Sequence, residues 1–93
     1  MIFPTYDINF KANLNDNSLL VTGEVENNSV RDYSVAMFRI ALFDKKQRLG
    51  TGFAKVYEFK KNTRKAFEAQ IKGAEATAIP SIARYEILFE TGY

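Results

Sequence analysis

Hydrophobic and polar residues alternate along most of this 93-residue chain. In residues 6–13, for example, Ile8 and Phe10 fall on one face of an extended chain, and the residues between and beside them are polar. A period of two with polar outer positions is typical of strands that bury one face. The alternation predicts six or seven strands, six of them bounded as residues 6–13, 19–27, 33–43, 50–57, 67–72 and 85–89.

Turn-forming residues separate these segments about every ten residues. The stretches "NLNDNS" and "NNSVRD" contain Asn, Asp and Ser, whose short side chains bond to their own backbone. In the longer connection "GAEATAIPSI", residues 73–82, Pro80 argues against a central strand, and one helical turn is expected. Short strands at this even spacing predict an all-β fold, which we interpret as a two-sheet antiparallel sandwich in a single domain, residues 1–93.

The residues that share the apolar face of each predicted strand define the expected core. Each of them is a large apolar residue, and within each segment they occupy every second position or positions of the same parity. The predicted core consists of Ile8, Phe10, Val21, Val25, Phe38, Ile40, Leu42, Phe67, Ile71, Ile87 and Phe89.

The segment 33–43 is apolar on both faces, which is typical of a strand that is central or covered. Arg39 is the polar residue on its second face. It either extends beside Phe43 or pairs with a carboxylate on a neighbouring strand, and pairing is the expectation. The apolar residues around it form a candidate surface for contact with other proteins if nothing in the domain covers them. The predicted protein-contact face consists of Val35, Met37, Arg39 and Phe43, with Phe53 and Tyr57 as its extension.

The stretch "IALFDKKQRLGTG", residues 40–52, contains two glycines in a G-x-G spacing. A phosphate-binding loop requires glycines between a strand and a helix, so that the helix N-terminal amides point at the anion. The residues after Gly52, "FAKVYEF", alternate like a strand instead. We therefore interpret the stretch as a β-hairpin, in which Gly50 and Gly52 let a neighbouring group fit closely against the backbone.

Composition limits the chemistry that the chain can perform. It has neither His nor Cys, so the most common general base, the strongest nucleophile and any disulfide or thiolate metal site are missing. No motif identifies a catalytic residue, and we predict no enzymatic activity and no cofactor. The net charge of +2 is small, and the basic clusters at residues 45–48 and 60–65 are expected at opposite ends of one strand. We therefore predict no nucleic-acid partner.

Residues 13–24, "NLNDNSLLVTGE", have the spacing of a calcium loop at several positions. Such a loop begins with an aspartate and has a glycine at its sixth position, where this chain has Asn13 and Ser18. The neutral oxygens of asparagine supply too little charge. We predict a turn, and no metal site.

No apolar run approaches the roughly 20 residues of a membrane-spanning helix, so we expect no direct membrane insertion. The first ten residues, "MIFPTYDINF", lack the basic and long apolar regions of a signal peptide. The lack of cysteine leaves the compartment open, because many exported domains also contain none.

The pentapeptide "IALFD", residues 40–44, resembles the F-x-L-Y-D signature of the FxLYD domain family, with Ile for Phe and Phe for Tyr. The flanking stretches "VTGEVENNSVRDYSVAMFRI" and "LGTGFAKVYEFKKNTRKAFEAQI" are similar to that family's strands, and the similarity extends over residues 19–89. The loop "FKKNTRKAF" lacks the family's Pro-Gly. The resemblance implies a bacterial immunoglobulin-like sandwich from envelope-associated or exported proteins, without catalytic residues. In such a hairpin, we expect Asp44 to accept hydrogen bonds from the backbone amides of "KKQR".

Together these observations predict an interaction or spacer module that binds a protein partner and is a monomer or a weak homo-oligomer. Contacts are expected through a strand edge or the predicted face. A standalone cytoplasmic protein that binds a peptide or an anion is the alternative, and a small enzyme without a recognisable site is the third.

Overall fold

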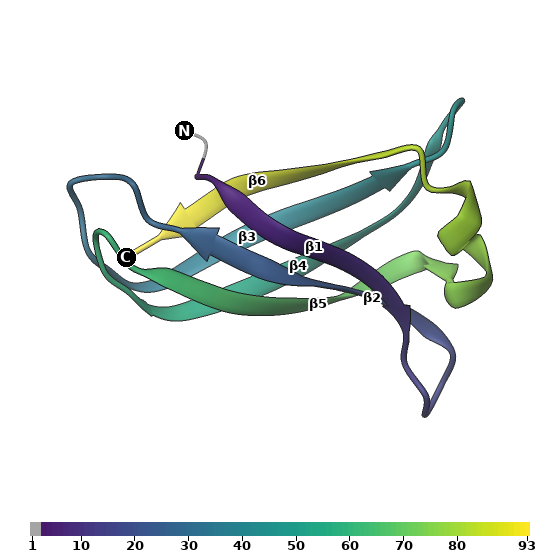
Figure 1. Ribbon diagram of the computed structural model, residues 1–93, viewed down its shortest axis with the longest axis horizontal. Helices are drawn as coiled ribbons and strands as arrows, with labels where there is room; N and C mark the ends of the chain where they lie inside the picture. Colours follow the sequence, from purple (N-terminus) through teal and green to yellow (C-terminus); the bar gives the residue numbers. More distant parts are fainter. Residues whose placement is uncertain (1–2) are drawn as a thin grey trace.

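The structure, a computed structural model, describes residues 3–93. Met1 and Ile2, which begin the segment predicted not to be a signal peptide, lie outside the described residues. The fold is all-β with one short 3₁₀ helix, as the alternation predicted (Figure 1). Its elements are β1 (Thr5–Ala12), β2 (Ser18–Glu26), β3 (Tyr33–Phe43), β4 (Arg48–Phe59), β5 (Arg64–Glu75), η1 (Ala76–Ser81) and β6 (Arg84–Gly92).

The six strands form one open antiparallel sheet in the order β1-β2-β5-β4-β3-β6. The expectation of two separate sheets is not confirmed. β1, β2 and β5 are joined by long runs of paired residues, as are β4, β3 and β6, whereas β4 and β5 are joined at the single pair Thr51 and Lys72. The sheet bends at this narrow join, and in Figure 1 β1, β2 and β5 lie over β3 and β4.

Gly50 and Gly52 lie on β4 at this join, and both are buried. A Cβ atom on Gly50 would lie 2.5 Å from the backbone oxygen of Lys72, and one on Gly52 would lie 2.5 Å from that of Gln70. The two glycines therefore allow the backbones of β4 and β5 to approach closely. The hairpin interpretation is confirmed, and a phosphate loop is incompatible with glycines inside a strand that no helix follows.

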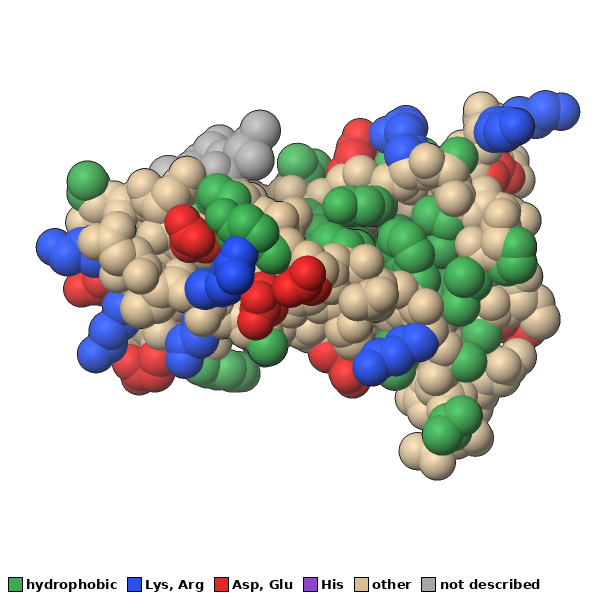
Figure 2. Space-filling model, in the orientation of Figure 1, with side chains coloured by type: hydrophobic (Ala, Val, Ile, Leu, Met, Phe, Trp, Pro, Cys, Tyr) green, Lys and Arg blue, Asp and Glu red, His purple; other side chains and the backbone are tan. Residues whose placement is uncertain are grey.

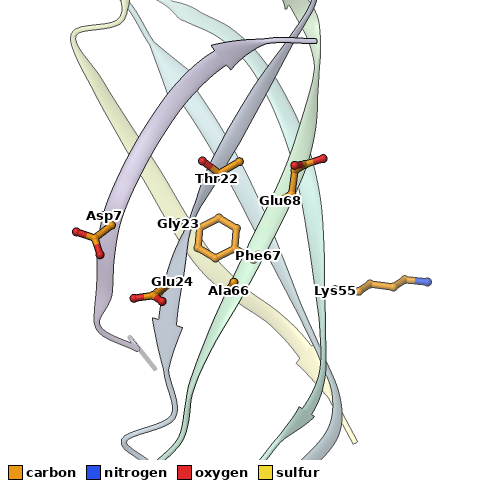
Figure 3. Close-up of a pocket in the computed structure, with 8 residues that line it drawn as sticks. All are labelled: Asp7, Thr22, Gly23, Glu24, Lys55, Ala66, Phe67 and Glu68. Atoms are coloured by element: carbon orange, nitrogen blue, oxygen red, sulfur yellow. The ribbon is translucent and has the colours of Figure 1, made fainter. Parts of the chain in front are cut away.

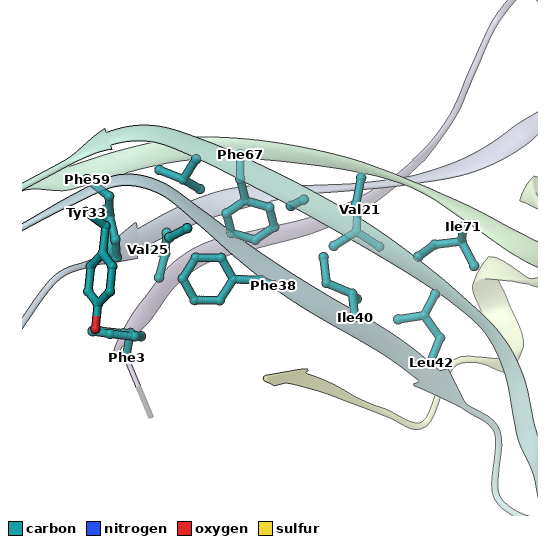
Figure 4. Close-up of a cluster of buried hydrophobic side chains, with 14 of the residues drawn as sticks. Phe3, Val21, Val25, Tyr33, Phe38, Ile40, Leu42, Phe59, Phe67 and Ile71 are labelled. Carbon is teal, nitrogen blue, oxygen red and sulfur yellow. The ribbon is translucent and has the colours of Figure 1, made fainter. Parts of the chain in front are cut away.

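The core lies between the two halves of the bent sheet, and side chains from both halves point toward one another in Figure 4. Every residue of the predicted core belongs to this cluster. Those from β2, β3 and β5 are buried, while those from the edge strands β1 and β6 are partly buried. The shared parity of residues within each strand therefore identified the core correctly.

Phe3 precedes β1 and yet is buried in the core, where its ring packs against four other aromatic rings. The centroid distances are 6.5 Å to Tyr33, 5.9 Å to Phe38, 5.5 Å to Phe59 and 5.3 Å to Phe89, all in edge-to-face geometry. Such pairs contribute about 0.5–1.5 kcal/mol each beyond their burial. Phe3 thus joins β3, β4 and β6 at one end of the core.

Asn27 is the one buried polar residue among residues 3–93, with 0% of its surface exposed. Its amide nitrogen donates to the backbone oxygens of Arg31 (2.8 Å) and Phe59 (2.9 Å), and its Oδ1 accepts from the backbone N–H (3.0 Å) and hydroxyl (2.6 Å) of Ser29. All four hydrogen-bonding positions of the amide are therefore used. The Asn27-Asn28-Ser29 tripeptide has the form of a glycosylation sequon, but its acceptor nitrogen is not accessible in the folded protein.

The edge strands are both irregular. In β1 the register shifts between Tyr6 and Asn9, where Asp7 has a φ of 55°. In β6 the register shifts where Phe89 and Thr91 pair with consecutive residues of β3, so that Glu90 is the additional residue. Bulges of this kind bend an edge strand and obstruct its pairing with another chain.

Two carboxylates fix turns at the end of the molecule where η1 lies (Figure 1). Asp44 accepts hydrogen bonds from the backbone N–H groups of Lys46 and Gln47, both at 2.7 Å, as predicted. These two bonds lower the pKa of Asp44. In the β1–β2 turn, the hydroxyl and backbone N–H of Ser18 bond to Asp16 and lower its pKa.

Candidate protein-contact face

The predicted contact residues lie on β3, and the predicted extension, Phe53 and Tyr57, lies on β4. All of them are on the side of β4, β3 and β6 that faces away from the core. In antiparallel strands, residues that are directly opposite share one face of the sheet. The pairing places Tyr57 and Tyr93 on either side of Val35, and Phe53 and Leu88 on either side of Arg39. We call this surface the contact face and define it by Val35, Met37, Arg39, Phe43, Phe53, Tyr57, Leu88 and Tyr93.

Val35 and Met37 are half-buried in the middle of the contact face, while Arg39 is exposed. The Nε of Arg39 lies 3.6 Å from Oε2 of Glu90 on the neighbouring strand. The side chains are 48% and 40% exposed, so that water screens this ion pair and its contribution to stability is small. Arg39 therefore has the carboxylate partner that one interpretation expected, and it remains accessible within an apolar surrounding.

Phe43 is less accessible to a partner protein than the sequence indicated. The guanidinium group of Arg84 lies 3.8 Å from the centroid of the Phe43 ring and covers it. The same guanidinium lies 3.1 Å from the carboxylate of Glu86. A shallow hollow of about 120 Å³ adjoins this site and is lined by Arg39, Ala41, Phe43, Arg48, Thr51, Glu86 and Leu88. This end of the contact face is consequently polar.

The rest of the contact face presents four exposed large apolar residues, with the charged side chains of Lys55 and Glu90 between them. Phe53 is 54% exposed, Tyr57 60%, Leu88 42% and Tyr93 73%. With an area of roughly 200 Å² for a whole aromatic side chain, these residues present roughly 400 Å² of mainly apolar surface. That area is typical of the largest patch on a monomeric protein, which is often functional.

Leu88 and Tyr93 were missing from the face that the sequence predicted. The signal for Leu88 was available, because Leu88 alternates with the core residues Ile87 and Phe89 and must point outward. Tyr93 lies beyond the last alternating segment, and its place is fixed by backbone hydrogen bonds with Val35 that the sequence does not reveal.

The outer face of the other half of the sheet has a different character. Figure 2 views this side and shows acidic and basic side chains interspersed over its middle, with hydrophobic side chains gathered toward the end where η1 lies. A hollow of about 570 Å³ there is lined by Asp7, Thr22, Gly23, Glu24, Lys55, Ala66, Phe67 and Glu68 (Figure 3). Its carboxylates lie on three strands, and the Lys55 side chain extends away from it in Figure 3. Glu24 is 3.7 Å from Arg64, whose guanidinium also covers the ring of Tyr6 at 3.5 Å. This is a solvated, mixed-charge surface.

A third hollow, of about 390 Å³, lies between the β3–β4 turn and the end of η1 with the two residues that follow it. Pro80, Ile82 and Ala83 supply apolar surface there, and Lys45 and Lys46 lie at its side. The second basic cluster lies in the β4–β5 turn, at the far end of the 12-residue β4. The two clusters therefore occupy opposite ends of one strand, as predicted.

Within residues 3–93, no group of three or more His, Cys, Asp or Glu side chains is arranged to hold a metal ion. In the "NLNDNS" turn, Oδ1 of Asn13 accepts a hydrogen bond from the backbone N–H of Asn15. Oδ1 of Asp16 accepts hydrogen bonds from the backbone N–H and the hydroxyl of Ser18. No helix in the described part of the chain has the length and apolar character needed to cross a membrane.

Comparisons of the chain with protein-family models, with curated proteins and with solved structures find no match.

Proposed function

We propose that this chain is a non-enzymatic interaction module that binds a protein partner through the contact face. The observation that carries the proposal is the exposed group of Phe53, Tyr57, Leu88 and Tyr93 around Val35 and Met37. Tyr and Phe are enriched at the centres of protein interfaces, and an accessible arginine among them is a frequent contributor to binding.

A face is a better contact site than an edge in this molecule. Both edge strands contain a register shift, in β1 next to Asp7 and in β6 next to Glu90. A chain that paired with either edge would lose continuous hydrogen bonding at the bulge. Contact through the outward side chains of a sheet face does not require continuous backbone pairing.

We further propose that the bent sheet is an immunoglobulin-like sandwich of the FxLYD type, formed by a single domain over residues 1–93. The join of β4 and β5 at one residue pair and the core shared by both halves support a two-layer description. A place in the bacterial cell envelope, or export, accompanies this family proposal and rests on the resemblance of "IALFD" and its flanks.

Anion or peptide binding at the hollow beside Lys45 and Lys46 is the second candidate function. It is favoured by two ammonium groups next to the apolar surface of Pro80 and Ile82. The hollow is lined by turn and loop residues, so its shape is less fixed than that of a sheet face. The contact face is therefore the first candidate.

Photo-crosslinking in the native host tests the proposed function. A photoreactive amino acid is placed at Phe53 in one variant and, as the matched control, at Leu14, which is 98% exposed in the β1–β2 turn. We expect crosslinks to a defined protein from position 53 and none from position 14. Equal crosslinking from both positions, or none from position 53, would contradict the proposal.

A further inference from the structure

The contact face is arranged so that it complements itself. β3 runs along its middle, and β4 and β6 lie on either side. A two-fold axis that lies parallel to β3, between two such faces, places β4 of one copy over β6 of the other. Residues that occupy the same level along the strands then meet across the interface. We infer that the partner of the contact face is a second copy of this chain, an inference that rests on the proposed function.

The apolar residues match under this symmetry. Phe53 and Leu88 are both opposite Arg39, so Phe53 of one copy meets Leu88 of the other. Tyr57 and Tyr93 are both opposite Val35, so these two rings also meet. Because the operation is two-fold, each contact occurs twice. The four exposed apolar residues of one copy thereby cover the four of the other.

The charges match as well. Lys55 and Thr91 are both opposite Met37, and Glu90 is the bulge residue next to Thr91. The axis along β3 therefore brings Lys55 of each copy to Glu90 of the other. An axis across the strands at the level of Met37 would instead bring Lys55 to Lys55 and Glu90 to Glu90, which is repulsive. The first arrangement also places Arg39 of one copy opposite Arg39 of the other, and each of these guanidinium groups has Glu90 of its own chain 3.6 Å away. The two Lys55–Glu90 pairs favour the first arrangement over the second.

The size of the patch predicts a weak association. A standard interface buries about 800 Å² on each partner, of which a little over half is apolar. The roughly 400 Å² of exposed apolar surface on the contact face is close to that share. At the polar end, however, the same axis brings Arg48 to Arg84, since both are opposite Phe43. This repulsion confines the interface to the end that contains Val35 and leaves it at the small, transient end of the range.

Sedimentation equilibrium over a concentration series provides the test, with two charge reversals, Lys55→Glu and Glu90→Lys. Either variant alone places two like-charged pairs in its dimer, and we expect its self-association to weaken by about tenfold, equivalent to ~1.4 kcal/mol. In a mixture of the two variants, both pairs have opposite signs again. The mixture should associate more tightly than either variant alone. Lys11→Glu is the control, because it makes the same change of charge at an exposed residue of β1, outside the contact face. It should leave self-association unchanged.

Wild-type protein that remains monomeric at the highest concentration would overturn the inference, as would a mixture that associates no better than its components. Weakening by Lys11→Glu equal to that by Lys55→Glu would also overturn it. In each case, crosslinking of Phe53 to a different protein would leave the proposed function standing with another partner. The failure of the second-copy inference is thus distinguishable from the failure of the contact face itself.

Discussion

Replacement of the buried Asn27 by aspartate is expected to destabilise the fold strongly, although it exchanges only the side-chain NH₂ group for an oxygen. The residue has 0% exposure, and its side chain holds two segments together: its own loop through Ser29 and Arg31, and β4 through Phe59. Asn27→Asp keeps the shape and replaces the donating nitrogen by an oxygen. That oxygen then faces the backbone oxygens of Arg31 and Phe59, 2.8 and 2.9 Å from the present nitrogen.

The magnitude follows from the bonds that are lost. Two donated hydrogen bonds contribute about 1 kcal/mol each, and a buried charge left without a partner raises the total cost to about 3–5 kcal/mol. A domain of this length has a free energy of unfolding of about 5–14 kcal/mol. The substitution therefore removes a large part of the stability. Asn28→Asp is the matched control, since Asn28 is exposed, and should change stability by less than about 0.5 kcal/mol.

Urea denaturation of the three proteins at several pH values is the assay. Burial among carbonyl oxygens raises the pKa of the introduced carboxyl group above its unfolded value. Its destabilising effect is therefore smallest at acid pH and grows as the pH rises through the folded-state pKa. Equal unfolding midpoints for Asn27→Asp and Asn28→Asp at neutral pH would refute the role assigned to Asn27.

Three further predictions concern the join, the hairpin and the core. Gly52→Ala places a Cβ 2.5 Å from the backbone oxygen of Gln70 and should cost about 1–3 kcal/mol in urea denaturation; unchanged stability would contradict the close approach of β4 and β5. Asp44→Ala should lower the melting temperature at neutral pH, and the deficit should disappear as the pH falls through the folded-state pKa of Asp44, which its hydrogen bonds lower below the unfolded value; a deficit that grew toward acid pH would contradict this. Phe38→Ala, at a site 3% exposed, should cost about 3–5 kcal/mol, whereas Phe53→Ala should cost far less, and similar losses would contradict the assignment of the two faces.

The sequence predicted the strands and the core well, because alternation records directly which side of a strand is buried. It did not predict the single sheet, because parity assigns a residue to a face and does not say which strands pair. Gly50 and Gly52 indicated a close approach, but their neighbours Lys72 and Gln70 lie 22 and 18 residues further along the chain, respectively. The bulge at Asp7 was hidden because the alternation continues through it in the sequence.

The sequence predicted only part of the contact face, because parity again assigns residues to a face without giving the strand register. The outward residues of β3 follow from parity, and so would Leu88 of β6. The covering of Phe43 by Arg84 depends on the register between β3 and β6, which the sequence does not encode locally. Phe3 was missed because it precedes the first strand, where no periodicity reports burial. Asn27 shares the parity of Val21 and Val25 at the end of the predicted strand, and it was missed because a polar residue does not indicate burial.

The most direct test of the contact face is to map backbone amide chemical shifts by NMR while the purified protein is diluted over a wide concentration range. We predict that the shifts that change with concentration cluster on β4 and β6, around Phe53, Tyr57, Leu88 and Tyr93, and that β1 and the β1–β2 turn are unaffected. Changes that cluster on β1 or in the turns beside η1, or shifts that do not depend on concentration, would contradict self-association through this face.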